Sequence, residues 1–241
     1  MRKIFYLIAF LSLSISEIPA QNRPLQVAVV TGGHDFDSAA FFGMFDSFKG
    51  VQYRQLTQPG ALGMIQQKDG RFPDAVVFYD MPQEISARGK EVFRMLLMGG
   101  TGLVFLHHSL ASYQQWPEYK KMVGGKYHEK NSPDASKYST YKHDVQVPVK
   151  ILDPTHPVCA GIHDFSLLDE VYGSFEVLSG VIPLLGTSQP ESGPVIGWTQ
   201  QVANSRIVYI QPGHDKNAFS NQDYRRLVFQ AIRYVSEESA Y

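Results

Sequence analysis

Apolar, β-branched runs alternate with helical patterns along most of the chain. The runs predict strands at residues 25–31, 52–56, 75–81, 102–107 and 206–210. Between them, residues 37–48 and 84–98 carry apolar side chains at helical spacing. This alternation is typical of βαβ units, so the pattern predicts an α/β fold with a mostly parallel sheet and helices on both of its faces.

The second half of the chain departs from this alternation. Residues 116–144 are polar and rich in Gly, Lys and Tyr, which indicates a long functional loop. Residues 145–152 and 176–185 look like strands without a long helix between them, so we expect an antiparallel addition to the sheet. Ser220 and Asp223 form a capping-box pattern that predicts the start of a final helix. No internal repeat or linker interrupts the chain, and residues 21–241 are interpreted as a single domain.

The first twenty residues have the pattern of a secretory signal peptide. Arg2 and Lys3 precede an apolar run at residues 4–15, and Ala20 ends a segment that resembles a cleavage site. A membrane anchor is the alternative, but this run is shorter than the ~20 residues that span a bilayer. We therefore expect cleavage near Ala20 and a periplasmic or extracellular protein with no stable membrane association.

Composition narrows the possible functions. The chain has 241 residues, of which 44% are hydrophobic and 19% charged, as in a soluble globular protein. Its net charge of −1 gives no field that would attract nucleic acid. The single cysteine, Cys159, excludes an internal disulfide framework, and its apolar neighbours predict a buried, unreactive thiol. Nucleophile-elbow, zinc-protease, P-loop and dinucleotide-binding motifs are absent.

Histidines follow three of the predicted strands. His34 follows residues 25–31, His107 and His108 follow residues 102–106, and His214 follows residues 206–210. Ligands of doubly wound sheets bind beyond the carboxyl ends of the parallel strands, so we expect His34, His108 and His214 to lie in one crevice. Adjacent residues of a strand point to opposite faces, and His107 is therefore interpreted as a packing residue. Asp215 is expected to orient the His214 imidazole.

Other polar residues have two interpretations each. His128 belongs either to a solvated turn or to the site. Glu170 and Tyr172 lie in an acidic segment that is either a helix start or part of the site. His143 and His163 are interpreted as surface residues, and His156 as a hydrogen-bonding residue of a rigid turn.

Six segments, taken in order, resemble the ThuA-like (trehalose utilisation) family. They are Gly-Gly-His-Asp-Phe at 32–36, Leu-His-His-Ser at 106–109, Gly-Gly-Lys-Tyr-His at 124–128, Asp-Pro-Thr-His-Pro-Val at 153–158, Asp-Glu-Val-Tyr at 169–172 and Gly-His-Asp at 213–215. The resemblance implies a flavodoxin-like fold of the class I glutamine amidotransferase type. The wider superfamily often carries a cysteine nucleophile after the strand that here leads to His107, His108 and Ser109. Glutamine amidotransferase activity is therefore not expected.

The resemblance also implies a role in disaccharide or ketosugar metabolism. Isomerisation or cleavage of a ketosugar needs a base and an acid or metal that stabilises an enediolate. The residues expected to be catalytic are His108, His214 and Glu170. Those expected to bind the sugar are His34, Asp35, His128 and Tyr172. In the enzyme, Tyr172 and the loop residues Tyr127, Tyr138 and Tyr141 suit stacking on a sugar face. In a second version, His108, His128, His214 and Glu170 hold a divalent cation, and the sequence does not choose between the two.

Two other functions remain open on the sequence. The first is a non-catalytic periplasmic protein that binds carbohydrate in the same crevice. The second is a serine hydrolase built on Ser109 and His214, which the missing nucleophile elbow disfavours.

Overall fold

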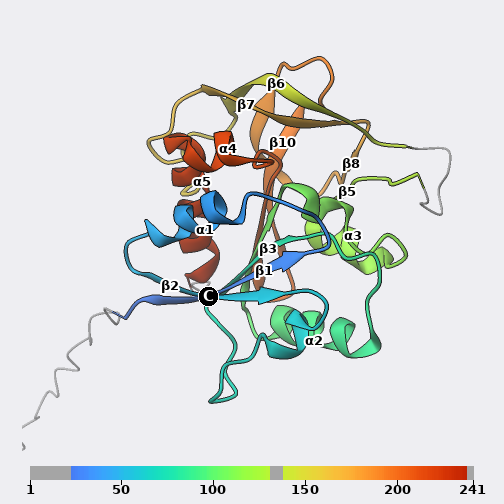
Figure 1. Ribbon diagram of the computed structural model, residues 1–241, viewed down its shortest axis with the longest axis vertical. Helices are drawn as coiled ribbons and strands as arrows, with labels where there is room; N and C mark the ends of the chain where they lie inside the picture. The colour runs from blue at the N-terminus through green and yellow to red at the C-terminus, as the bar shows by residue number, and fades with distance from the viewer. Residues whose placement is uncertain (1–22, 131–137, 238–241) are drawn as a thin grey trace, which may run out of the picture.

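A nine-stranded sheet runs through the centre of the computed structural model, which describes residues 23–130 and 138–237 (Figure 1). The predicted signal peptide, residues 1–20, lies outside the described residues. The strand order is β2-β1-β3-β4-β11-β10-β9-β6-β7. The first five strands are parallel to one another and comprise β2 (Val51–Thr57), β1 (Leu25–Gly32), β3 (Ala75–Asp80), β4 (Gly102–Leu106) and β11 (Ser205–Ile210).

The other four strands are antiparallel. They are β10 (Val195–Val202), β9 (Ile182–Thr187), β6 (Thr140–Ile151) and β7 (Phe165–Gly173). The α/β fold class predicted from the sequence is confirmed, with a mixed sheet whose core is parallel. The predicted antiparallel addition is confirmed as well. A separate two-stranded sheet pairs β5 (Gly125–Lys126) with β8 (Glu176–Val177).

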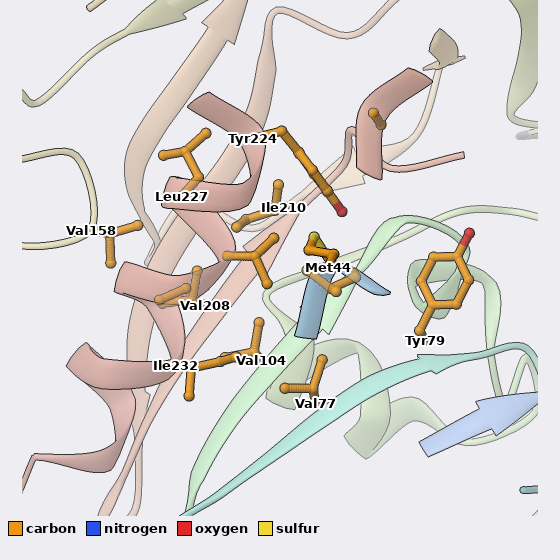
Figure 2. Packing of buried hydrophobic residues seen from close by; sticks show 14 of the residues in the cluster. Met44, Val77, Tyr79, Val104, Val158, Val208, Ile210, Tyr224, Leu227 and Ile232 are labelled. Atoms are coloured by element: carbon orange, nitrogen blue, oxygen red, sulfur yellow. The ribbon is translucent and has the colours of Figure 1, made fainter. Parts of the chain in front are cut away.

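Helices cover both faces of the parallel half. On one face lie α1 (Ser38–Asp46), α4 (Lys216–Ser220) and α5 (Gln222–Ser236); on the other lie α2 (Ala87–Met98), α3 (Pro117–Val123) and the 3₁₀ turn η1 (Ala61–Met64). Figure 2 shows the first face, where Leu227 and Ile232 of α5 pack over Val104 and Val208 of the sheet. Because the central strands β3 and β4 are buried on both faces, their sequences are nearly continuous in apolar residues, unlike that of the edge strand β2.

Two sequence expectations are wrong in detail. The predicted loop at 116–144 contains α3, which begins at Pro117, buries Tyr119 and Met122, and ends at Gly124 in the left-handed conformation (φ 88°). The final helix is capped by Asn221, whose side chain accepts hydrogen bonds from the backbone N–H groups of residues 223 and 224. Ser220 instead ends α4. Asparagine and serine are comparable N-caps, so the sequence pattern did not separate the two positions.

Two of the sequence interpretations concern residues between β6 and β7, Cys159 and His156. Cys159 is fully buried, and burial raises the pKa of its thiol to about 12, which confirms an unreactive thiol. The His156 ring accepts a hydrogen bond from the backbone N–H of Val158, which confirms its structural role. Within the described ranges, no helix is long and apolar enough to cross a membrane.

The hairpin of β6 and β7 brings the far edge of the sheet to the ends of the parallel strands. In Figure 1 it lies at the top of the molecule, above α4. Asp169 of β7 accepts hydrogen bonds from the backbone N–H groups of Gly213 (2.7 Å) and His214 (2.9 Å), which follow β11. This contact places the next residues of β7, Glu170 and Tyr172, beside the histidines at the strand ends.

Candidate functional site

His107 is the most enclosed residue of the site. It begins the 3₁₀ turn η2 (His107–Ala111) with a left-handed backbone (φ 48°), and its side chain is fully buried. Its Nδ1 donates to the carbonyl oxygen of Gln211 (2.7 Å), and its Nε2 lies 2.8 Å from Glu170 Oε2 and 2.9 Å from the Tyr172 hydroxyl. The expectation that His107 points away from the site is wrong, because the chain leaves the strand at Leu106 and strand alternation no longer applies.

Glu170 is surrounded by three imidazoles. Besides His107, His214 Nδ1 lies 3.2 Å from Oε2 and His143 Nδ1 lies 3.5 Å from Oε1. Burial opposes ionisation of the carboxyl group, but its hydrogen bonds with His107 and His214 outweigh that effect and hold the pKa of Glu170 well below its usual range. The hydrogen bond with Glu170 in turn raises the pKa of His214 despite partial burial. The site therefore favours an ionised Glu170 carboxylate and the protonated form of the His214 imidazole.

His34 and His108 stack on each other beside this cluster. Their ring centroids are 4.6 Å apart, and the His34 ring is 6.4 Å from that of His214. The three imidazoles predicted to share one crevice therefore lie side by side, although only His34 and His108 line the cavity. Burial lowers the pKa of His108 well below its usual value, which keeps the ring neutral. Neither of its ring nitrogens has a hydrogen-bond partner in the part of the chain that the structure describes.

These side chains border a cavity of about 230 Å³. Its lining comprises His34, Met81, His108, Ala111, Tyr127, Glu129, Tyr141, His143, Glu170 and Tyr172. The structure thus brings four of the residues that the sequence assigned to the site to one cavity: His34, His108, Glu170 and Tyr172. His214 contacts this group through Glu170.

Three sequence interpretations do not match this arrangement. His128 does not line the cavity; its Nε2 lies 3.2 Å from Glu176 of β8. Asp35 is exposed and is also not among the lining residues. Asp215 caps α4 by accepting from the backbone N–H of Asn217, and Glu170 is the carboxylate that orients His214. Of the residues in the metal version, Glu170 and His214 form with His107 a group among the described residues whose ligand atoms all lie within 4.8 Å of one another, and His108 and His128 are not part of it.

His143 is the site residue that sequence reasoning missed. It is exposed, as expected, yet its ring packs 4.6 Å from the His214 ring. The register of β6 against β7 shifts between Lys142 and Val145, and Asp144 adopts φ 56°. Such a bulge redirects side chains, often next to active sites. The signal in the sequence was only a histidine near the start of a strand.

The serine hydrolase interpretation finds no support in this geometry. Ser109 is fully buried, and its hydroxyl does not line the cavity. A nucleophile must reach its substrate, so Ser109 is not placed to act as one.

Asp80, at the end of β3, is a buried carboxyl group outside the histidine cluster. Burial raises its pKa to about 7, although Gln58 Nε2 donates to Oδ2 (3.0 Å). Because the pKa is higher in the folded than in the unfolded state, the stabilising contribution of protonated Asp80 is complete below about pH 4 and is lost as the pH rises through 7. Ionisation at alkaline pH therefore leaves an incompletely paired charge in the core.

We expect Asp80→Asn to remove this pH dependence. An amide stays neutral, so the free energy of unfolding of the variant relative to wild type should rise by about 2–3 kcal/mol between pH 5 and pH 8. Urea unfolding at the two pH values measures the difference. Glu84→Gln, at an exposed carboxylate, is the matched control and should change little. If Asp80→Asn and wild type differ by the same free energy of unfolding at both pH values, the pKa of Asp80 is not raised.

The chain has an α/β fold that resembles class I glutamine amidotransferase-like structures, and histidines follow the ends of its parallel strands. A glutamine amidotransferase from Thermotoga maritima superposes with a TM-score of 0.52 at 9% identity, over 89% of this chain and 99% of that one. Residues 66–235 match the model of the ThuA family, described as trehalose utilisation, and the chain belongs to that family.

Solved ThuA-like structures have the same fold. A ThuA-like protein from Parabacteroides merdae gives a TM-score of 0.75 at 14% identity and covers 91% of this chain and 92% of its own. One from Bacteroides uniformis gives 0.67 at 17% identity, over 90% and 94%. No curated protein matches the sequence. At these identities the structural likeness establishes the fold alone.

Proposed function

We propose that this protein is an exported enzyme of carbohydrate utilisation that isomerises or cleaves a disaccharide or ketosugar. The observation that carries the proposal is the convergence of His34, His108, His143 and Glu170 on one cavity. Imidazoles and carboxylates that share a space are suited to moving protons at neutral pH. Membership of a family described by trehalose utilisation supports a sugar as the substrate.

The two parts of the site suit two parts of such a reaction. A ketosugar loses the proton next to its carbonyl to a base, and negative charge develops on the carbonyl oxygen. His108 suits the first role, because it lines the cavity and both of its ring nitrogens are unpartnered among the described residues. The group of His107, Glu170 and His214 suits the second role, either as a proton donor or as a holder of a cation that stabilises the oxyanion.

A neighbouring cavity supports a disaccharide over a single sugar. It has a volume of about 410 Å³ and shares Met81 and Glu129 with the first cavity. Gln83 and Gln115 add side-chain amides, which pair well with sugar hydroxyls, whereas the buried Gln114 amide donates to the carbonyl oxygens of Ala111 and Tyr127. Tyr127 and Tyr141 line the first cavity, where an aromatic ring can stack on a sugar face.

The test is an assay of the purified full chain with glucosides, disaccharides and their 3-keto derivatives in D₂O, followed by NMR. We expect a new product, or deuterium at the carbon next to the carbonyl. Binding without turnover or exchange would favour the non-catalytic carbohydrate-binding protein. Neither binding nor turnover would contradict both functions. Export is tested separately by cell fractionation and by sequencing the N-terminus, which we expect to begin after Ala20.

A further inference from the structure

The tautomer of His107 is fixed by its surroundings. Its Nδ1 lies 2.7 Å from the carbonyl oxygen of Gln211, and a carbonyl can only accept, so Nδ1 carries a proton. In the neutral ring, Nε2 is therefore a bare lone pair. A histidine whose Nδ1–H is held by a backbone carbonyl has the tautomer and the orientation of a metal ligand.

That lone pair faces Glu170, His214 and the Tyr172 hydroxyl, and the His107 side chain is fully buried. His107 Nε2 is 2.8 Å from Glu170 Oε2 and 3.3 Å from His214 Nδ1, and the Glu170 side chain is only 7% exposed. Such a contact needs positive charge between its atoms. Protons on His107 and His214 would supply that charge one contact at a time, whereas a single cation would be shared by all three atoms.

We propose that His107, Glu170 and His214 bind a divalent transition-metal cation of the Zn²⁺ or Mn²⁺ type. The three donor atoms form a triangle with sides of 2.8, 3.2 and 3.3 Å. Zinc–ligand bonds of about 2.0–2.2 Å in a tetrahedral site place donor atoms roughly 3.3 Å apart, so the triangle needs to widen only slightly. Two imidazoles and a carboxylate are ligands that such metals accept.

The fourth coordination position faces the cavity. Of the three ligands, only Glu170 lines the cavity. His143, which is not a ligand, also lines the cavity, and its Nδ1 lies 3.5 Å from the second carboxylate oxygen of Glu170. A three-ligand site with an open position can accept water or a substrate oxygen. The catalytic use of the cation rests on the proposed function, whereas its binding does not.

The test measures metal binding directly, without an assay of activity. The full chain, free of any affinity tag, is analysed for bound metal, stripped with a chelator and titrated with Zn²⁺ alone. We expect one Zn²⁺ per chain in the wild type. Loss of a residue that only hydrogen-bonds to a metal ligand weakens metal binding by roughly 10–100-fold. Because Glu170 is itself a ligand in this proposal, Glu170→Gln should weaken Zn²⁺ binding by more than that. His163→Ala, at an exposed histidine, is the matched control and should bind Zn²⁺ as the wild type does.

A second variant guards against misfolding of the first. His214→Ala replaces a side chain that is 25% exposed and should also weaken Zn²⁺ binding. Unchanged affinity in both variants, or no stoichiometric binding by the wild type, would overturn the site. Metal binding without sugar turnover would refute the proposed function and leave the site standing. Turnover by a metal-free protein, undiminished by chelation, would refute the catalytic use of the cation and leave the proposed function standing.

Discussion

Replacing Glu170 by glutamine is expected to lower turnover of the sugar substrate by about 10²–10⁴-fold. Glutamine keeps the shape of the side chain but removes the negative charge that His107, His143 and His214 surround. It also replaces one acceptor oxygen by an amide N–H group, which cannot accept a hydrogen bond from His214. The loss should appear mainly in kcat, because the charge supports the chemical step more than it supports ground-state binding.

The matched control is Glu191→Gln. Glu191 is an exposed glutamate that pairs with Lys142 on the surface and does not line the cavity of the site. Its replacement should change stability by no more than about 0.5 kcal/mol and leave turnover as it was. Kinetics are measured at a temperature where thermal unfolding shows both variants folded. Undiminished turnover by Glu170→Gln would remove Glu170 from the proposed mechanism.

The parallel half of the fold was predictable because the apolar pattern of a buried strand is a local feature of the sequence. A strand buried on both faces must be almost entirely apolar, and β3 and β4 satisfy that requirement residue by residue. Once parallel strands are expected, their carboxyl ends define one edge, and this rule alone brought His34 and His214 together. Glu170 and Tyr172 needed the family resemblance, since their segment read equally well as a helix start.

The parts that were not predictable depend on long-range packing. Which of His107 and His108 points toward the site depended on where β4 ends. β4 ends at Leu106, one residue earlier than the predicted strand, so the alternation expected for a strand does not apply to the two histidines. His143 enters the site only because β6 is bulged and folds over the strand ends. The orienting carboxylate of His214 comes from Glu170, 44 residues away in sequence, rather than from the adjacent Asp215. Proximity in sequence therefore did not predict which carboxylate contacts His214.

Asp169→Ala is expected to have the largest effect on stability, about 3–5 kcal/mol. The Asp169 carboxylate is buried and accepts from the backbone N–H groups of Gly213 and His214. Alanine would leave both donors unpaired, at a cost of about 1–3 kcal/mol each. Urea unfolding measures the loss. Asp164→Ala is the matched control, since Asp164 is exposed and accepts from a single backbone N–H, that of Ile151.

The hydrogen bonds of Asp169 with Gly213 and His214 both stabilise the fold and position His214. The variant Asp169→Asn tests the second role with a smaller loss of stability. Asparagine keeps one acceptor and should lose less stability than alanine, but it turns an amide N–H toward one of the two backbone donors. The loop that carries His214 must then shift away from Glu170. We expect this variant to remain folded yet to lose turnover, with kcat reduced more than the affinity for the sugar. A folded Asp169→Asn variant with wild-type kcat would show that the position of His214 is held by other contacts, and that β7 supplies Glu170 without also positioning the histidine.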